Sequence, residues 1–75
     1  MGLSAEEKQL IHLYHLVLTE LSFEHFKYRS NLLKYQRWND QQRLNWVYRM
    51  EHEALKELPF AVELVGRAVA LKVTQ

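Results

Sequence analysis

The chain has 75 residues, of which 48% are hydrophobic and 25% charged, and its formal net charge is +1. This composition excludes a disordered chain, and the absence of cysteine excludes a fold supported by disulfides. The length allows one domain, residues 1–75, and the scarcity of helix breakers, with Gly 2 and Pro 1, predicts that this domain is all-α.

The first predicted helix covers residues 5–38. Ser4 is a favourable N-cap, and Glu7 stands three residues later, as a capping box requires. No Gly or Pro occurs between Leu3 and Pro59, so a sharp break has no obvious cause and we expect a continuous helix. A bend near Ser22 is the alternative, because the apolar pattern changes there.

This helix has one apolar stripe in its first half and two in its second. Placed at 100° steps, the apolar residues of the first half fill a broad arc: Leu10, Ile11, Leu13, Tyr14, Leu16, Val17, Leu18 and Leu21. Tyr28, Leu32 and Tyr35 continue that stripe, whereas Phe26 and Leu33 point to the opposite side. We therefore predict that Phe26 and Leu33 are reserved for contact with a second molecule.

A turn and two shorter helices follow. Trp38-Asn39-Asp40 is the best turn candidate, because Asn and Asp compete with the helix for backbone hydrogen bonds and either can cap the next helix. A second helix is predicted over residues 41–58. Pro59 lacks an N–H and its ring clashes with the preceding turn, so it either kinks this helix or ends it, and a last helix is predicted over residues 60–72.

The lengths of these helices predict a long antiparallel hairpin. A helix over residues 5–38 spans roughly 50 Å, and residues 40–72 span nearly the same length. Two helices alone make a poor core, so we expect two chains to form a homodimeric four-helix bundle. A compact three-helix monomer is the alternative.

Basic residues are concentrated in the middle of the chain. Residues 27–49 contain six Lys and Arg against the single acid Asp40, and the two flanking thirds are net acidic. Two tryptophans lie in the same segment and are expected to be free to stack on a ligand. The predicted partner-binding residues are Phe26, Arg29, Leu33, Lys34, Arg37, Trp38, Arg43 and Trp46.

Such a cluster can bind an acidic protein surface or a nucleic acid. Because the whole chain is close to neutral, unlike most dedicated nucleic-acid-binding modules, we favour a solvated surface or one that binds a partner protein with an acidic surface over a nucleic-acid site. A small nucleic-acid-binding regulator is the alternative, and it would use Arg29, Lys34, Arg37, Trp38 and Arg43.

Glu51 is the one carboxylate in the middle of an apolar stripe. Burying an unpaired carboxylate is costly, so Glu51 should find a polar partner, and the hairpin register places it near Tyr28, His25 or Lys27. With no second carboxylate on the same stripe, we interpret Glu51 as a structural group that fixes the register rather than as a catalytic acid.

His12 and His15 are three residues apart, a spacing that permits shared metal ligation. The Glu-x-x-His pattern of di-iron bundles is absent, and so are a Gly-rich phosphate loop, a His-Glu-x-x-His zinc motif and a nucleophile elbow. We therefore expect no enzyme activity, no metal and no cofactor, and histidines that lie at the surface or in an interface.

The first residues lack the basic region and apolar core of an export signal, and no apolar run approaches the roughly 18 residues of a membrane span. We expect a cytoplasmic protein without membrane contact. No motif resembles that of a known family closely enough to name a function. The excess of apolar helix faces predicts a small non-enzymatic adaptor, regulatory or assembly protein that acts by protein–protein interaction.

Overall fold

Four α-helices make up the part of the chain that the computed structural model describes, residues 2–74. They are α1 (Ala5–Glu24), α2 (Arg29–Arg37), α3 (Asp40–Leu55) and α4 (Pro59–Thr74), with a short 3₁₀ helix, η1 (Phe26–Tyr28), before α2. The prediction of an all-α fold is confirmed. No helix among these residues combines the length and the hydropathy that crossing a bilayer requires.

α1 begins where the sequence predicts. The Ser4 hydroxyl accepts a hydrogen bond from the backbone N–H of Glu7 at 3.1 Å, and the Glu7 carboxylate accepts one from the backbone N–H of Ser4 at 2.8 Å. This capping box satisfies two N–H groups that have no partner within the helix. The local sequence therefore fixes the start of α1 at Ala5.

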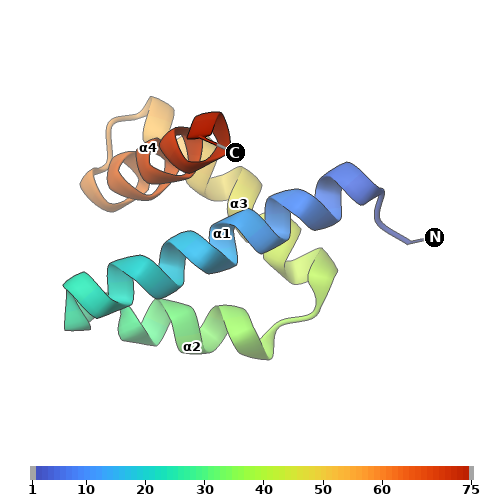
Figure 1. The fold of residues 1–75 in the computed structure, drawn as a ribbon, viewed down its shortest axis with the longest axis horizontal. Coiled ribbons are helices and arrows are strands. Elements are labelled where there is room, and N and C mark those ends of the chain that lie inside the picture. Colours follow the sequence, from blue (N-terminus) through green and yellow to red (C-terminus); the bar gives the residue numbers. More distant parts are fainter. Residues whose placement is uncertain (1, 75) are drawn as a thin grey trace.

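The predicted continuous helix over residues 5–38 is wrong, because the chain leaves the helical conformation at His25. His25 has φ −136° and ψ 104°, and η1 then reverses the chain so that α2 runs back along α1 (Figure 1). The reversal uses no positive φ, so it needs no glycine. It buries the ring of Tyr35, whose hydroxyl donates to the carbonyl oxygen of Ile11 at 2.5 Å. This burial against α1 is the physical reason for the break.

Asn39 and Pro59 both mark helix starts. The Asn39 side chain accepts from the backbone N–H of Gln42, and the Gln42 side chain accepts from the backbone N–H of Asn39, each at 2.9 Å. The predicted turn at residues 38–40 is therefore confirmed. Pro59 is the first residue of α4, where its missing N–H costs nothing, so it begins a helix and does not kink one.

α3 ends at Leu55, three residues before the predicted end at residue 58. The N–H of Leu58 donates to the carbonyl of Glu53 at 3.3 Å, and the N–H of Glu57 donates to the carbonyl of Ala54 at 3.0 Å. These two bonds form a Schellman motif, which requires a left-handed residue after the helix. Glu57 takes that conformation, with φ 61°.

Replacing Glu57 by glycine should raise the free energy of unfolding by about 0.5–1 kcal/mol. A side chain in the left-handed region costs about 1–2 kcal/mol, and the larger entropy of glycine in the unfolded chain offsets part of the gain. Urea denaturation measures the change. Glu57→Ala is the control, because it removes the same charge and keeps the Cβ atom. An equal gain in both variants would attribute the effect to charge and not to backbone strain.

α1 lies at the centre of the fold, with α2 along one side, α4 on the other and α3 passing behind (Figure 1). The longest extent of the molecule is 35 Å, and its radius of gyration, 11.8 Å, is close to the roughly 11 Å expected for a compact domain of this length. The predicted long hairpin is therefore wrong, and the compact alternative is closer, with four helices in place of three. A single chain covers its own core, so the reason for expecting a two-chain bundle no longer holds.

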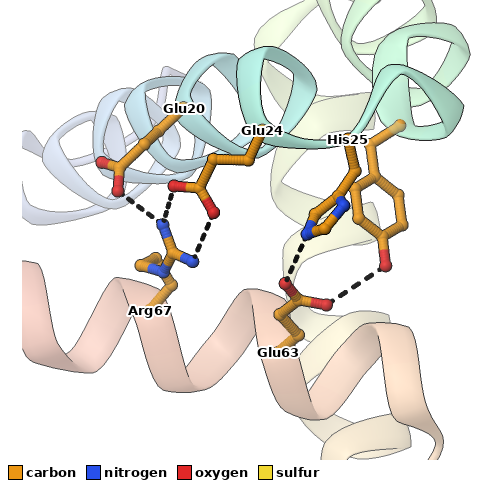
Figure 2. Close-up of polar contacts among 6 residues, drawn as sticks. Glu20, Glu24, His25, Glu63 and Arg67 are labelled. Atoms are coloured by element: carbon orange, nitrogen blue, oxygen red, sulfur yellow. Dashed lines mark hydrogen bonds and ion pairs between the residues drawn. The ribbon is translucent and has the colours of Figure 1, made fainter.

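Polar contacts join α4 to the end of α1. Arg67 donates to Glu20 at 2.5 Å and to the two carboxylate oxygens of Glu24 at 2.7 and 2.9 Å (Figure 2). Bonding to the Arg67 guanidinium lowers the pKa of the Glu24 carboxyl. One turn earlier on α4, Glu63 lies 4.0 Å from His25. Through these contacts, the side of α4 that carries Glu63 and Arg67 faces the end of α1.

Candidate functional site

The site begins with α2, whose two ends are held by different elements. At its start, the Tyr28 ring stacks on Phe60 with a centroid separation of 4.8 Å, and the Tyr28 hydroxyl donates to Glu63 at 3.1 Å. Both partners belong to α4, so the start of α2 is attached to the first turns of that helix. α2 is thus fixed in place even though its N-cap, Tyr28, makes no side-chain capping bond.

Arg43, from the first turns of α3, holds the other end of α2. Its Nε donates to the carbonyl of Tyr35 at 2.8 Å and its Nη2 to the carbonyl of Gln36 at 2.9 Å, while Nη1 donates to Asp40 at 2.9 Å. Carbonyls at a helix C-terminus have no partner within the helix, and a cation there is favourable. Arg43 was predicted to bind a partner, and its donors are instead occupied within the fold.

Replacing Arg43 by lysine should lower the free energy of unfolding by about 1–3 kcal/mol. Lysine keeps the charge, but it cannot donate to two carbonyls and a carboxylate in one plane as guanidinium does. Thermal and urea unfolding measure the loss. Arg49→Lys, an exposed site on the same helix, is the matched control and should change stability by less than about 0.5 kcal/mol. If both variants lose an equally small amount of stability, Arg43 does not cap α2.

Trp38 and Trp46 do not stand free, contrary to the prediction. Trp46 is 7% exposed, and its ring centroid lies 5.6 Å from that of Tyr35 and 6.1 Å from that of Trp38. Trp38 is half-buried against the same cluster. The three rings pack the inner side of α2 against α3. Trp46 is therefore a core residue, and a base could not stack on its buried ring.

The outward side of η1 and α2 carries the other five predicted partner-binding residues, called here the α2 face: Phe26, Arg29, Leu33, Lys34 and Arg37. Phe26 and Leu33 are 77% and 47% exposed. The Arg29 guanidinium lies 5.8 Å from the centroid of the Phe26 ring, a cation–π distance. The structure thus brings these five residues onto one uncovered surface, as their spacing along a helix predicts.

Charge on the α2 face has a single sign. Among the described residues, no salt bridge involves any of its three cations. Residues 25–39 contain no Asp or Glu, so no carboxylate on η1 or α2 can neutralise them. The α2 face therefore combines exposed apolar groups with positive charge that forms no salt bridge within the described part of the fold.

Phe23 was not singled out by the sequence, and it is 87% exposed near the end of α1. Helix periodicity could have predicted this exposure, because Phe23 falls on the same side of α1 as His12 and Thr19, away from the buried arc. Phe23 and Phe26 flank the break at His25, so two exposed aromatic rings stand on either side of this turn.

Glu51 has a structural partner, but a different one from those predicted. Its carboxylate accepts a hydrogen bond from the Tyr14 hydroxyl at 3.2 Å. Burial, together with the nearby Glu51 carboxylate, raises the pKa of the Tyr14 phenol. The predicted contact with Tyr28, His25 or Lys27 is wrong because the break at His25 removes the hairpin register on which it depended.

His12 and His15 line a hollow of about 340 Å³ between α1, α2 and the start of α3. The Nε2 atom of His15 is 3.4 Å from the side-chain nitrogen of Gln36, and His12 is exposed. Within residues 2–74, no three His, Asp or Glu side chains are grouped so that they could hold a metal ion.

Neither the scan against family models nor the searches of curated proteins and solved structures gave a match to this chain.

Proposed function

We propose that this chain is a small, non-enzymatic, cytoplasmic adaptor or regulatory protein that binds an acidic partner protein through the α2 face. The observation that carries this proposal is the gathering of Phe26, Leu33 and three cations on one exposed side of η1 and α2. These cations form no salt bridge with a residue of the described range 2–74, and residues 25–39 contain no acid.

Each part of the α2 face has a physical role in such binding. Exposed aromatic and aliphatic side chains supply most of the affinity when a partner buries them, so Phe26 and Leu33 are the proposed anchors. Arg29, Lys34 and Arg37 lie around these anchors, where charge accelerates association and selects partners of opposite sign. α2 has nine residues and is about 14 Å long, which suits a partner helix that presents an apolar stripe bordered by Asp and Glu.

A nucleic acid is the weaker candidate for the same surface. Binding of single strands relies on aromatic rings that bases can stack on. Trp46 is buried and Trp38 half-buried, which leaves Phe26 as the aromatic group of the α2 face. The three cations of the α2 face, in a chain that is nearly neutral overall, would neutralise few phosphates, so the binding would be weak at physiological salt.

Two synthetic helical peptides with the same leucine stripe, one bordered by Glu and the other by Lys, test this proposal. We expect the Glu peptide to bind, more weakly as salt increases, and the Lys peptide not to bind. The readout is fluorescence anisotropy of the labelled peptides. A labelled single-stranded oligonucleotide and vesicles of anionic lipid are measured in parallel. Tighter binding of either one than of the Glu peptide would contradict a protein partner.

A further inference from the structure

α4 has a second apolar side that faces away from the fold. Its inner side contributes Ala61, Leu64 and Ala68 to the core. The adjacent solvent side, called here the valine strip, consists of Val62, Gly66, Val69, Ala70 and Val73. Val62, Val69 and Val73 are 46%, 56% and 80% exposed. At 100° per residue these five positions share one side of the helix, so they form a continuous apolar surface.

The valine strip carries no charge, because the charged residues of α4 are turned elsewhere. Glu63 and Arg67 point to the end of α1, where they contact His25, Glu20 and Glu24 (Figure 2). Lys72, the remaining charged residue of α4, lines a groove together with Leu13 and Leu16 of α1. The side of α4 that water can reach most freely is therefore apolar and carries no charge.

The distribution of charge determines which surface of this chain can pack against the same surface of a second copy. A two-fold interface places a patch against the same patch, so every charge on it approaches a like charge. The three cations of the α2 face would repel each other in such a pair, whereas the valine strip has none to repel. We infer that the valine strips of two copies of this chain pack on each other to form a homodimer.

The size of the strip sets the strength of this dimer. α4 has 16 residues and is about 24 Å long, and the strip is one helix wide. Two such strips bury less than the roughly 1,600 Å² of a standard interface, so we expect a dissociation constant on the order of 100 μM. Leu58, the residue directly before α4, is also exposed and adds apolar surface near the first turn of that helix.

The dimer leaves the α2 face free. α2 and α4 lie on opposite sides of α1, so a partner on α4 does not cover α2 (Figure 1). A homodimer would present two α2 faces, and a partner with two acidic segments would bind it more tightly than it binds a monomer. This last consequence rests on the proposed function, whereas the dimer itself does not.

Sedimentation analysis from about 10 μM to about 1 mM tests the dimer. The wild-type chain should shift from the mass of a monomer to that of a dimer over this range. Val69→Lys should remain a monomer with an unchanged helical circular dichroism spectrum, because the side chain of Val69 is exposed and only the dimer brings two lysines together. Val69 is near the middle of the strip, so an equal mixture of Val69→Lys and Val69→Glu chains should dimerise again.

Leu16→Lys, an exposed leucine on α1 outside both surfaces, is the matched control and should dimerise as the wild type does. A wild type that is monomeric at about 1 mM would overturn the inference, and so would a Val69→Lys chain that dimerises normally. Loss of the dimer in Phe26→Asp/Leu33→Asp but not in Val69→Lys would place the interface on α2 and would equally overturn it. Binding of the Glu peptide to monomeric Val69→Lys tests the proposed function separately.

Discussion

Replacing Tyr35 by alanine should lower the free energy of unfolding by about 3–5 kcal/mol, the range for truncation of a fully buried aromatic side chain. The ring is 1% exposed and packs between α1 and α3, with centroids 5.6 Å from Trp46 and 6.0 Å from His15. A domain of this length has a total stability of about 4–11 kcal/mol, so the variant should be partly unfolded at room temperature.

The Tyr35→Phe variant separates the ring from its hydroxyl group. It keeps the packing and removes only the bond to the Ile11 carbonyl, so we expect a loss of about 1 kcal/mol and a melting temperature lower by about 4–8 °C. Urea denaturation of both variants gives the two values. A loss below about 1 kcal/mol for Tyr35→Ala would mean that α2 is not packed onto α1 through this side chain.

Reversing two charges on the α2 face should weaken binding of the acidic peptide by about 100-fold, or about 2.7 kcal/mol. In Arg29→Glu/Arg37→Glu, two attractions become two repulsions beside the anchors Phe26 and Leu33. Neither cation forms a salt bridge with a described residue, so the stability of the fold should change by less than about 0.5 kcal/mol. Fluorescence anisotropy measures the affinity and circular dichroism the fold.

The matched control for this variant is Lys8→Glu/Arg49→Glu. It changes the net charge by the same amount, at exposed positions on α1 and α3 outside the α2 face. We expect it to weaken binding by no more than about threefold, because it changes only the overall electrostatic attraction between the chain and the peptide. Equal losses in both variants would show that net charge, and not the α2 face, attracts the peptide.

The features that were predicted correctly depend on residues close together in the sequence. Ser4 with Glu7 and Asn39 with Gln42 cap their helices through bonds that span three residues. Phe26 and Leu33 stood out because helix periodicity separates them from the Tyr28–Tyr35 stripe, and both are exposed. Local rules were sufficient for these features, because neither capping nor periodicity needs knowledge of the tertiary fold.

The features that were missed depend on contacts between distant segments. The break at His25 has no local signal in the sequence, because a backbone with negative φ needs no glycine and no Gly or Pro is nearby. The change of the apolar pattern near Ser22 was the one indication of the break. The roles of Arg43 and Trp46 follow from that break, because the break places α2 against α1. Arg43 of α3 then bonds the C-terminal carbonyls of α2, and Trp46 of α3 packs on the Tyr35 ring. Tertiary packing thus decides which side chains of this basic and aromatic segment stabilise the fold and which remain exposed.

The most direct test of the proposed binding surface is a titration of ¹⁵N-labelled protein with the Glu-bordered peptide, followed by amide chemical shifts. The largest changes are expected at Phe26, Arg29, Leu33 and Arg37, with none along the valine strip of α4 beyond those that dilution alone causes. Changes centred on α4 or on the hollow beside His12, or saturation of the peptide without any change on α2, would contradict the assignment of the partner site to the α2 face.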